Sequence, residues 1–382
     1  MATITAKADG NWSSAGTWNG GVAPGNGDTA DLNNHSVTQD IATIPASGTL
    51  LAIQNTGGGT LNVPGGYTIN ATNVSNIADN AQVLTASGAI IINGSVNNTA
   101  AAAVSGDTTL ALLTAGNTII SGSVINSGNN TSGDGIAGNT TCCAVAQQVG
   151  SLAIGGSVSN SGSTAWGLES VIQDPKQTCS IGGNISNSGN GGAAIRFPQG
   201  SESNMITVGG NASNTGTNGY VTVFDSSYHG GVIDISGNWS NSTGTNGNVN
   251  TPNGNLVIIR GNCSAAITPL GYVIVLGTIT GAVTLANYGV LFSYAGKLQG
   301  TFANTYGLWC CWGNPTTNAS WIAAGSGGQA STIRLAPGAS IFKVGLSTVQ
   351  LSVDGGGGGG GYPYFDSWSP NDTPFPPSST AS

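Results

Sequence analysis

The segment IIINGSVNN at residues 90–98 carries the pattern that decides the fold. Counted from Gly94, the even positions hold Ile90 and Ile92 before the glycine and Val96 and Asn98 after it. A period of two is typical of a β-strand with one buried face. Glycine inside such a pattern marks a bend or a close approach of two backbones. The segment therefore predicts two short strands that meet at a glycine.

This segment recurs along the chain, and each copy is centred on a glycine. The spacings between successive glycines are 28, 34, 27, 27, 27 and 24 residues. A repeat of about 20–50 residues is typical of a solenoid, in which each copy buries its apolar face against its neighbours. The central glycines are Gly94, Gly122, Gly156, Gly183, Gly210, Gly237 and Gly261.

The positions around each central glycine keep their chemistry from copy to copy. The residue two before the glycine is always Ile or Val, and the residue one after it is always Ser or Asn. We expect even positions to face the core and odd positions to face solvent. Cys179 and Cys263 fall on even positions, so we interpret them as small buried hydrophobic residues.

An asparagine stands four residues after the glycine in six successive copies. On the inward face of a parallel solenoid these amides would stack about 4.8 Å apart, which is the spacing between strands. Each amide could then donate a hydrogen bond to the next and accept one from the previous, which satisfies buried polar groups. The predicted ladder consists of Asn98, Asn126, Asn160, Asn187, Asn214 and Asn241.

These observations predict an all-β chain whose main part is a single-stranded parallel β-helix with coils of 24–34 residues. We assign residues 1–80 to an N-terminal Trp- and Gly-rich β cap or attachment region, and 81–300 to a β-helix of about eight coils. Residues 301–354 form a C-terminal β module, and 355–382 form a glycine linker with an extended arm. Because each coil buries its face only against its neighbours, both ends need caps or partner subunits.

The N-terminal region contains two tryptophans among turn-forming residues. Residues 12–28 follow the pattern W-x(4)-T-W-x-G-G-x-x-P-x-x-G-D. This pattern resembles the start of many phage and bacterial surface β-helix proteins. The resemblance implies a virion or cell-surface structural protein, and it implies a trimer. Asp28 and Asp31 are two carboxylates, too few for the six to eight oxygens that Ca²⁺ takes, so turn and cap roles are expected for them.

Seven consecutive glycines at 355–361 predict a flexible linker near the C-terminus. The segment beyond it is rich in proline and aromatic residues, which can bury rings on a neighbouring subunit. The alternative is a disordered tail. The expected assembly residues of this arm are Tyr362, Tyr364, Phe365, Trp368 and Phe375.

Composition excludes several classes of protein. Of 382 residues, 63 are Gly and 40 are Asn, charged residues make up 6%, and the net charge is −8. With seven Lys and Arg, no nucleic-acid partner is expected. No apolar run is long enough to insert into a membrane, and the N-terminus lacks the basic and apolar regions of a secretory signal. The six cysteines include two vicinal pairs, Cys142–Cys143 and Cys310–Cys311. We interpret them as reduced thiols, with cross-linking between subunits and a metal site as alternatives.

Catalytic chemistry has few candidate groups in this sequence. Glu169 and Arg196 lie 27 residues apart, as do Glu202 and His229, so each pair should meet on adjacent coils. We interpret both as ion pairs across coils, worth under about 1 kcal/mol each when exposed. A polysaccharide depolymerase would need paired carboxylates, which Glu202 could form with Asp225 or Asp234. We predict no catalytic residue, metal or cofactor.

The sequence therefore favours a non-enzymatic structural protein of a phage virion: a capsid decoration or cement protein, a head fibre, or a tail spike or fibre. Its expected partners are further copies of itself, other virion proteins and host-surface glycans. The alternative is a bacterial extracellular adhesin or filament subunit at the cell surface. A phage-borne polysaccharide depolymerase is the third hypothesis.

Overall fold

The computed structural model describes residues 1–102, 108–131, 141–170, 178–197, 205–224, 231–242, 248–249, 251, 254–285, 289–294 and 298, and separate strands between 302 and 367. It consists almost entirely of strands in long parallel sheets, as expected for a parallel β-solenoid. The chain divides into two compact units. The first comprises Met1–Ile233 and Ser242–Gly247, and the second comprises Asp234–Asn241 and Asn248–Ser382.

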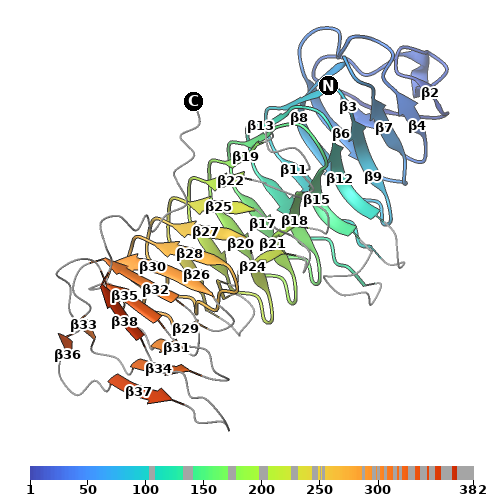
Figure 1. Ribbon diagram of the computed structural model, residues 1–382. Coiled ribbons are helices and arrows are strands. Elements are labelled where there is room, and N and C mark those ends of the chain that lie inside the picture. The colour runs from blue at the N-terminus through green and yellow to red at the C-terminus, as the bar shows by residue number, and fades with distance from the viewer. Residues whose placement is uncertain are drawn as a thin grey trace. The chain divides into compact units, whose positions relative to one another are not determined.

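The first sheet of the N-terminal unit grows by parallel pairing of each coil with the next (Figure 1). From residue 89 onward each coil contributes two short strands to it, separated by the glycine bend. Its strands are β1 (Thr3–Thr5), β3 (Thr29–Asp31), β5 (Thr43–Ile44), β6 (Leu50–Asn55), β8 (Thr68–Asn76), β10 (Ala89–Ile92), β11 (Val96–Asn98), β13 (Thr118–Ile120), β14 (Val124–Asn126), β16 (Leu152–Ile154), β17 (Val158–Asn160), β19 (Thr178–Ile181), β20 (Ile185–Asn187), β22 (Met205–Val208) and β23 (Ala212–Asn214).

The second sheet of this unit receives one strand from every coil, again in parallel order. A short 3-10 helix, η1 (Asn19–Gly21), precedes the second coil. The strands of the second sheet are β2 (Gly10–Asn11), β4 (Ser36–Thr38), β7 (Thr60–Val63), β9 (Gln82–Ala86), β12 (Thr108–Thr114), β15 (Thr141–Gln147), β18 (Trp166–Ser170), β21 (Ala193–Phe197) and β24 (Tyr220–Phe224).

The C-terminal unit has its own parallel ladders. One ladder runs through β27, β28, β30, β32, β35 and β38, and another through β29, β31, β34 and β37. The strands are β25 (Val232–Ile235, shared with the first unit), β26 (Trp239–Asn241), β27 (Leu256–Ile259), β28 (Tyr272–Val275), β29 (Val283–Leu285), β30 (Val290–Tyr294), β31 (Phe302–Asn304), β32 (Leu308–Trp312), β33 (Thr316–Thr317), β34 (Trp321–Gly325), β35 (Thr332–Leu335), β36 (Phe342–Lys343), β37 (Val349–Val353) and β38 (Tyr364–Ser367).

The solenoid begins earlier than residue 81, the boundary drawn from the repeat. Thr3 of β1 pairs with Thr29 of β3, so coils already fill residues 1–80. These coils lack the central glycine by which the repeat was recognised. Parallel pairing also continues beyond residue 300, and it includes Tyr364–Ser367, which were expected to belong to an extended arm.

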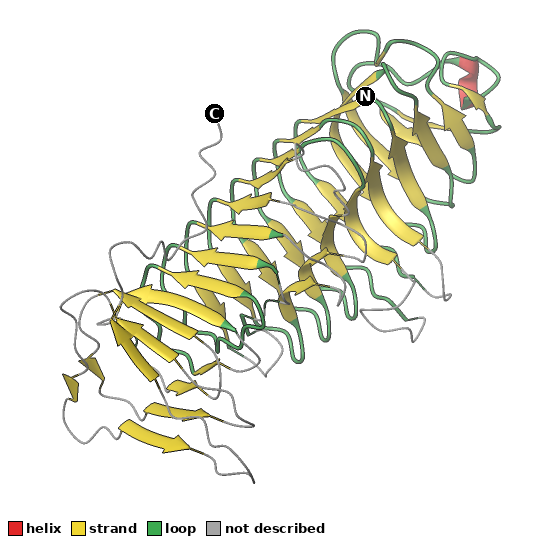
Figure 2. Cartoon of the chain, in the orientation of Figure 1, coloured by secondary structure: helices red, strands yellow, loops and turns green. Residues whose placement is uncertain are grey.

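The core lies between the sheets and follows the predicted parity. In each repeat of the N-terminal unit the residues two before and two after the central glycine are buried, as Ile92 and Val96 show with no exposed surface. The described loops connect successive strands at the corners of the coils (Figure 2). The second sheet departs from strict alternation, because Leu110 and Leu113 belong to one hydrophobic cluster although they are three residues apart.

The central glycines are required because successive coils approach closely. A Cβ added at Gly183 would lie 2.8 Å from the backbone carbonyl carbon of Gly156 in the previous coil. A Cβ added at Gly156 or Gly210 would come similarly close to the backbone of the previous coil. None of these three glycines has a positive φ, so the constraint is space between coils and not backbone conformation.

Candidate functional site

A column of buried asparagines runs through the N-terminal unit and joins six coils. Each Nδ2 donates to the Oδ1 of the asparagine in the next coil, and every member is at most 1% exposed. The bonds run Asn76–Asn98 (3.0 Å), Asn98–Asn126 (2.7 Å), Asn126–Asn160 (2.7 Å), Asn160–Asn187 (2.8 Å) and Asn187–Asn214 (2.8 Å). A buried amide that is satisfied in this way avoids the desolvation cost of an unpaired polar group.

The same amides also close the turn that follows each strand. Asn160 Nδ2 donates to the carbonyl of Gly162 at 2.9 Å, and Asn187 makes the equivalent bond to Gly189 at 3.1 Å. A Cβ at Gly162 or Gly189 would collide with the glycine carbonyl of the previous coil. The Asn-x-Gly spacing is therefore a combined signal for the ladder and the turn.

The described ladder begins one coil earlier than predicted. Asn76 is a member that the glycine motif did not reveal, although its register with Asn98 places it in the column. Asn55 lies in register with Asn76, but its Oδ1 accepts from the backbone N–H groups of residues 57–59 instead. Asn241 belongs to the other unit and is half-buried.

A second ladder uses the position directly after the central glycine. Here the side-chain oxygen of one coil accepts from the backbone N–H of the next coil. Ser123 N–H donates to Ser95 Oγ at 3.1 Å, and Asn211 N–H donates to Asn184 Oδ1 at 2.7 Å. The C-terminal unit repeats the arrangement, since Asn262 N–H donates to Asn238 Oδ1 at 2.7 Å. This explains why the position is always Ser or Asn, which the sequence showed without giving a reason.

Acidic side chains serve the same purpose throughout the described part of the chain. Each of the seven whose side chain is described links its own coil to an adjacent one, through a backbone N–H, a hydroxyl or an arginine. Asp79, for example, accepts from the N–H of Ala101 at 2.7 Å. The seven are Asp9, Asp28, Asp31, Asp40, Asp79, Glu169 and Asp234.

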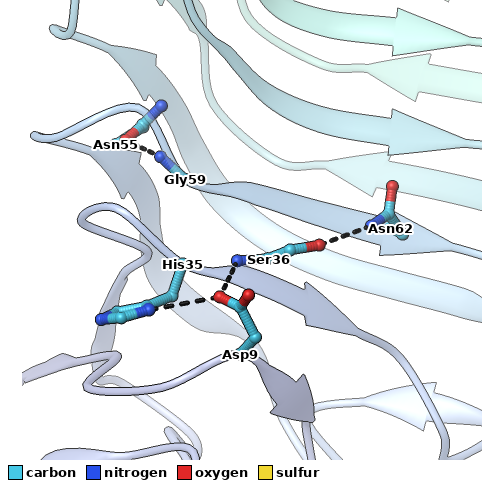
Figure 3. Close-up of polar contacts among 6 residues, drawn as sticks. All are labelled: Asp9, His35, Ser36, Asn55, Gly59 and Asn62. Atoms are coloured by element: carbon cyan, nitrogen blue, oxygen red, sulfur yellow. Dashed lines mark hydrogen bonds and ion pairs between the residues drawn. The ribbon is translucent and has the colours of Figure 1, made fainter.

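The first coils show how such a carboxylate is held (Figure 3). Asp9 Oδ1 accepts from Ser36 N–H at 2.9 Å and lies 3.2 Å from His35 Nδ1. The backbone hydrogen bond from Ser36, and then the contact with His35, lower the pKa of Asp9. Ser36 Oγ accepts from Asn62 Nδ2 at 3.2 Å, so the hydroxyl faces the next coil. The Asp, His and Ser side chains are therefore engaged in joining coils.

The N-terminal edge of both sheets is covered by residues 12–21. Trp12 and Trp18 are at most 1% exposed, and their rings meet edge to face with centroids 4.9 Å apart. Lys7 N–H donates to the carbonyl of Thr17, and Thr17 Oγ1 donates to the carbonyl of Asn11 in β2. Because an open sheet edge invites pairing with other chains, we interpret this cover as an N-terminal cap.

Glu169 and Arg196 meet on adjacent coils, as their spacing predicted, but the pair is buried. Arg196 Nη1 lies 3.2 Å from Glu169 Oε2, and the two residues are 6% and 8% exposed. The guanidinium also stands over the ring of Trp166, 4.5 Å from its centroid. The expectation of a weak exposed pair is corrected here, because breaking a buried pair costs about 3–5 kcal/mol. Asp234 and Arg260 form a further pair between coils at 2.6 Å, in which Asp234 is 9% exposed and the arginine side chain is 52% exposed.

The four cysteines with described side chains are free and buried. Burial raises the pKa of Cys142 to about 11 and the pKa of Cys179 and Cys263 to about 12. Burial also raises the pKa of Cys143, which favours the protonated thiol in both vicinal residues. Cys179 and Cys263 occupy the inward positions predicted for them. The side chains of Cys310 and Cys311 lie outside the described residues.

Other predicted residues cannot be placed. Glu202, His229 and Asp225 lie outside the described residues, as do Tyr362, Trp368 and Phe375 of the arm. Tyr364 and Phe365 are placed as backbone in β38. Within the described ranges, no group of three or more His, Cys, Asp and Glu side chains could hold a metal ion. The described part of the chain also has no helix with the length and apolar character needed to cross a membrane.

Comparison of the chain with protein-family models, with curated proteins and with solved structures gives no match.

Proposed function

We propose that this chain is a non-enzymatic structural protein of a phage virion, serving as a capsid decoration or cement protein, a head fibre, or a tail spike or fibre. The observation that carries the proposal is the use of all seven described acidic side chains as links between coils. Catalysis needs such groups free to face a substrate. Here the side chains of the described coils stabilise the solenoid itself.

The proposal includes assembly into a homo-oligomer, expected to be a trimer, through the solenoid and the C-terminal arm. A capped N-terminal edge supports this arrangement, since it directs contacts away from the open end of the sheets and toward faces and the C-terminal region. Other virion proteins and host-surface glycans are the proposed further partners, and the virion is the proposed location. An adhesin or filament subunit at a cell surface would be built in the same way.

The test is the molar mass of the purified protein by light scattering, with and without residues 355–382. We expect the full-length chain to be an oligomer and the truncated chain to form an assembly of fewer subunits. A panel of bacterial surface polysaccharides incubated with the full-length protein should show no new reducing ends. A full-length protein with the molar mass of a monomer would overturn the proposal. Cleavage of any polysaccharide by the full-length protein, if Glu202→Gln abolishes that cleavage, would overturn it as well.

A further inference from the structure

The outer face of the main ladder carries apolar residues on three successive strands of the C-terminal unit. In β19 of the N-terminal unit the inward residues Cys179 and Ile181 alternate with exposed polar ones. In β27 the inward residues Val257 and Ile259 alternate instead with Leu256 and Ile258. Strands that are apolar on both faces indicate that both faces are covered in the working protein.

The outward apolar residues of three successive strands form one patch. Leu256, Tyr272 and Val290 are paired in register, and so are Ile258, Ile274 and Phe292. Ile274 and Phe292 form the centre of a hydrophobic cluster against which Leu256, Ile258, Leu276 and Val290 pack. We call these six residues with Tyr272 the outer apolar patch. Strands β27, β28 and β30, which carry it, lie side by side (Figure 1).

A single chain leaves the edge of this patch open to water. Tyr272 is 45% exposed and the adjacent Leu270 is 37% exposed, whereas Ile274 at the centre is 8% exposed. No member of the patch carries a charge. A contiguous apolar surface with an exposed aromatic ring is typical of a protein–protein contact.

We propose that the outer apolar patch binds the C-terminal segment 368–382 of a second copy of this chain, a proposal that rests on the assembly proposed above. The segment contains Trp368, Phe375 and four prolines, and Asp372 is its single charged side chain. Proline-rich segments are pre-formed in an extended conformation and dock on surfaces that present aromatic rings. Tyr272 supplies such a ring at the exposed edge of the patch.

The segment is long enough to reach a neighbour. The segment follows directly after β38, which is the last strand of the ladder β28–β30–β32–β35–β38. Three strand spacings, about 14 Å, separate β38 from β30. Fifteen residues in an extended proline-type conformation span about 46 Å. The segment can therefore leave its own unit and still lay two aromatic rings and four prolines on another copy.

The experiment places a photo-reactive benzoylphenylalanine at Phe375 in the full-length protein. Equal amounts of ¹⁴N- and ¹⁵N-labelled protein are mixed, allowed to exchange and irradiated, and cross-linked peptides are identified by mass spectrometry. We expect cross-links to peptides covering 256–292, with half of the linked pairs mixed in isotope. In parallel, Tyr272→Ser should raise the dissociation constant of the oligomer at least tenfold. Ile119→Ser is the matched control, because Ile119 is 51% exposed on the outer face of β13 in the other unit.

The outcomes separate this inference from the proposed assembly. Cross-links confined to one isotope, or to peptides outside 256–292, overturn the docking proposal. An oligomer that survives both Tyr272→Ser and removal of residues 368–382 overturns it as well, while assembly through another surface stands. A full-length protein that is monomeric at all concentrations overturns the proposed assembly together with the docking. Unchanged circular dichroism of the variants shows that the solenoid is intact.

Discussion

Replacing Asn98 by alanine tests whether the asparagine column stabilises the solenoid. Asn98 donates to Asn126 Oδ1 at 2.7 Å and to the carbonyl of Ala100 at 3.2 Å, and it accepts from Asn76 Nδ2 at 3.0 Å. Its neighbour Asn97 is the same residue type on the same strand, but it points outward and is half-buried. The pair therefore separates the ladder from any general effect of removing an asparagine.

The expected loss follows from the three hydrogen bonds. Each buried bond contributes about 1 kcal/mol net, so Asn98→Ala should cost about 3 kcal/mol in the free energy of opening this coil. The partners left behind keep part of their bonding, because Asn126 Nδ2 still donates to the carbonyl of Gly128 at 3.1 Å. Asn97→Ala should stay within about 0.5 kcal/mol of the wild type, as is usual for surface changes.

Native-state hydrogen exchange is the suitable assay, because stacked repeats need not unfold in one step. The backbone N–H of Ser127 donates to the carbonyl of Asn98 at 2.8 Å, so its protection reports directly on this coil. A loss of about 3 kcal/mol corresponds to exchange that is faster by roughly two orders of magnitude. If both alanine variants exchange at the same rate, the ladder contributes no particular stability, and the reasoning on buried amides fails.

Three further outcomes are expected. Gly183→Ala should lower the free energy of unfolding by about 1–3 kcal/mol, because the added Cβ would lie 2.8 Å from the backbone of the previous coil. Gly65→Ala is the control, since a Cβ at Gly65 meets no atom within 4 Å. Equal effects of the two variants in urea titrations would contradict the close-approach argument. Cys179 and Cys263, whose pKa is about 12, should resist iodoacetamide at pH 8 until the protein is denatured; labelling of the native protein, seen by peptide mass spectrometry, would show that they are accessible. Asp28 accepts from the N–H groups of Ala2 and Gly25, which lower its pKa, so it stabilises the first coils at neutral pH, and this contribution is lost as the pH falls through the lowered pKa. Protection of the Ala2 amide against exchange should therefore fall with acid, and in Asp28→Asn this part of the pH dependence should be missing.

The sequence predicted the middle of the solenoid because the pattern there is local and periodic. Ile92, Gly94, Val96 and Asn98 each recur at a fixed offset, and parity alone decides which of them face the core. The same reasoning placed five of the ladder asparagines in a single column. It could not find the first coils, where Asn73 stands near the bend and no central glycine marks the repeat.

The sequence could not predict whether a residue pair is buried or exposed. The spacing of 27 residues brought Glu169 and Arg196 together, but only the packing of Trp166 and the surrounding second sheet decided that the pair is buried. In the same way, a Ser or Asn after the central glycine was visible as a pattern. Its partner is a backbone N–H of the next coil, which no offset within one repeat could reveal.

The sequence by itself determined the period, the inward face and the chemistry of each column, because a repeating strand fixes these over a few residues. The tertiary structure decided what joins one coil to the next: the seven acidic links, the cap formed by Trp12 and Trp18, and the outward apolar face around Tyr272. The acidic links join residues 22 to 27 positions apart, and the outward apolar face joins residues 16 to 18 positions apart, so both form only when the coils stack.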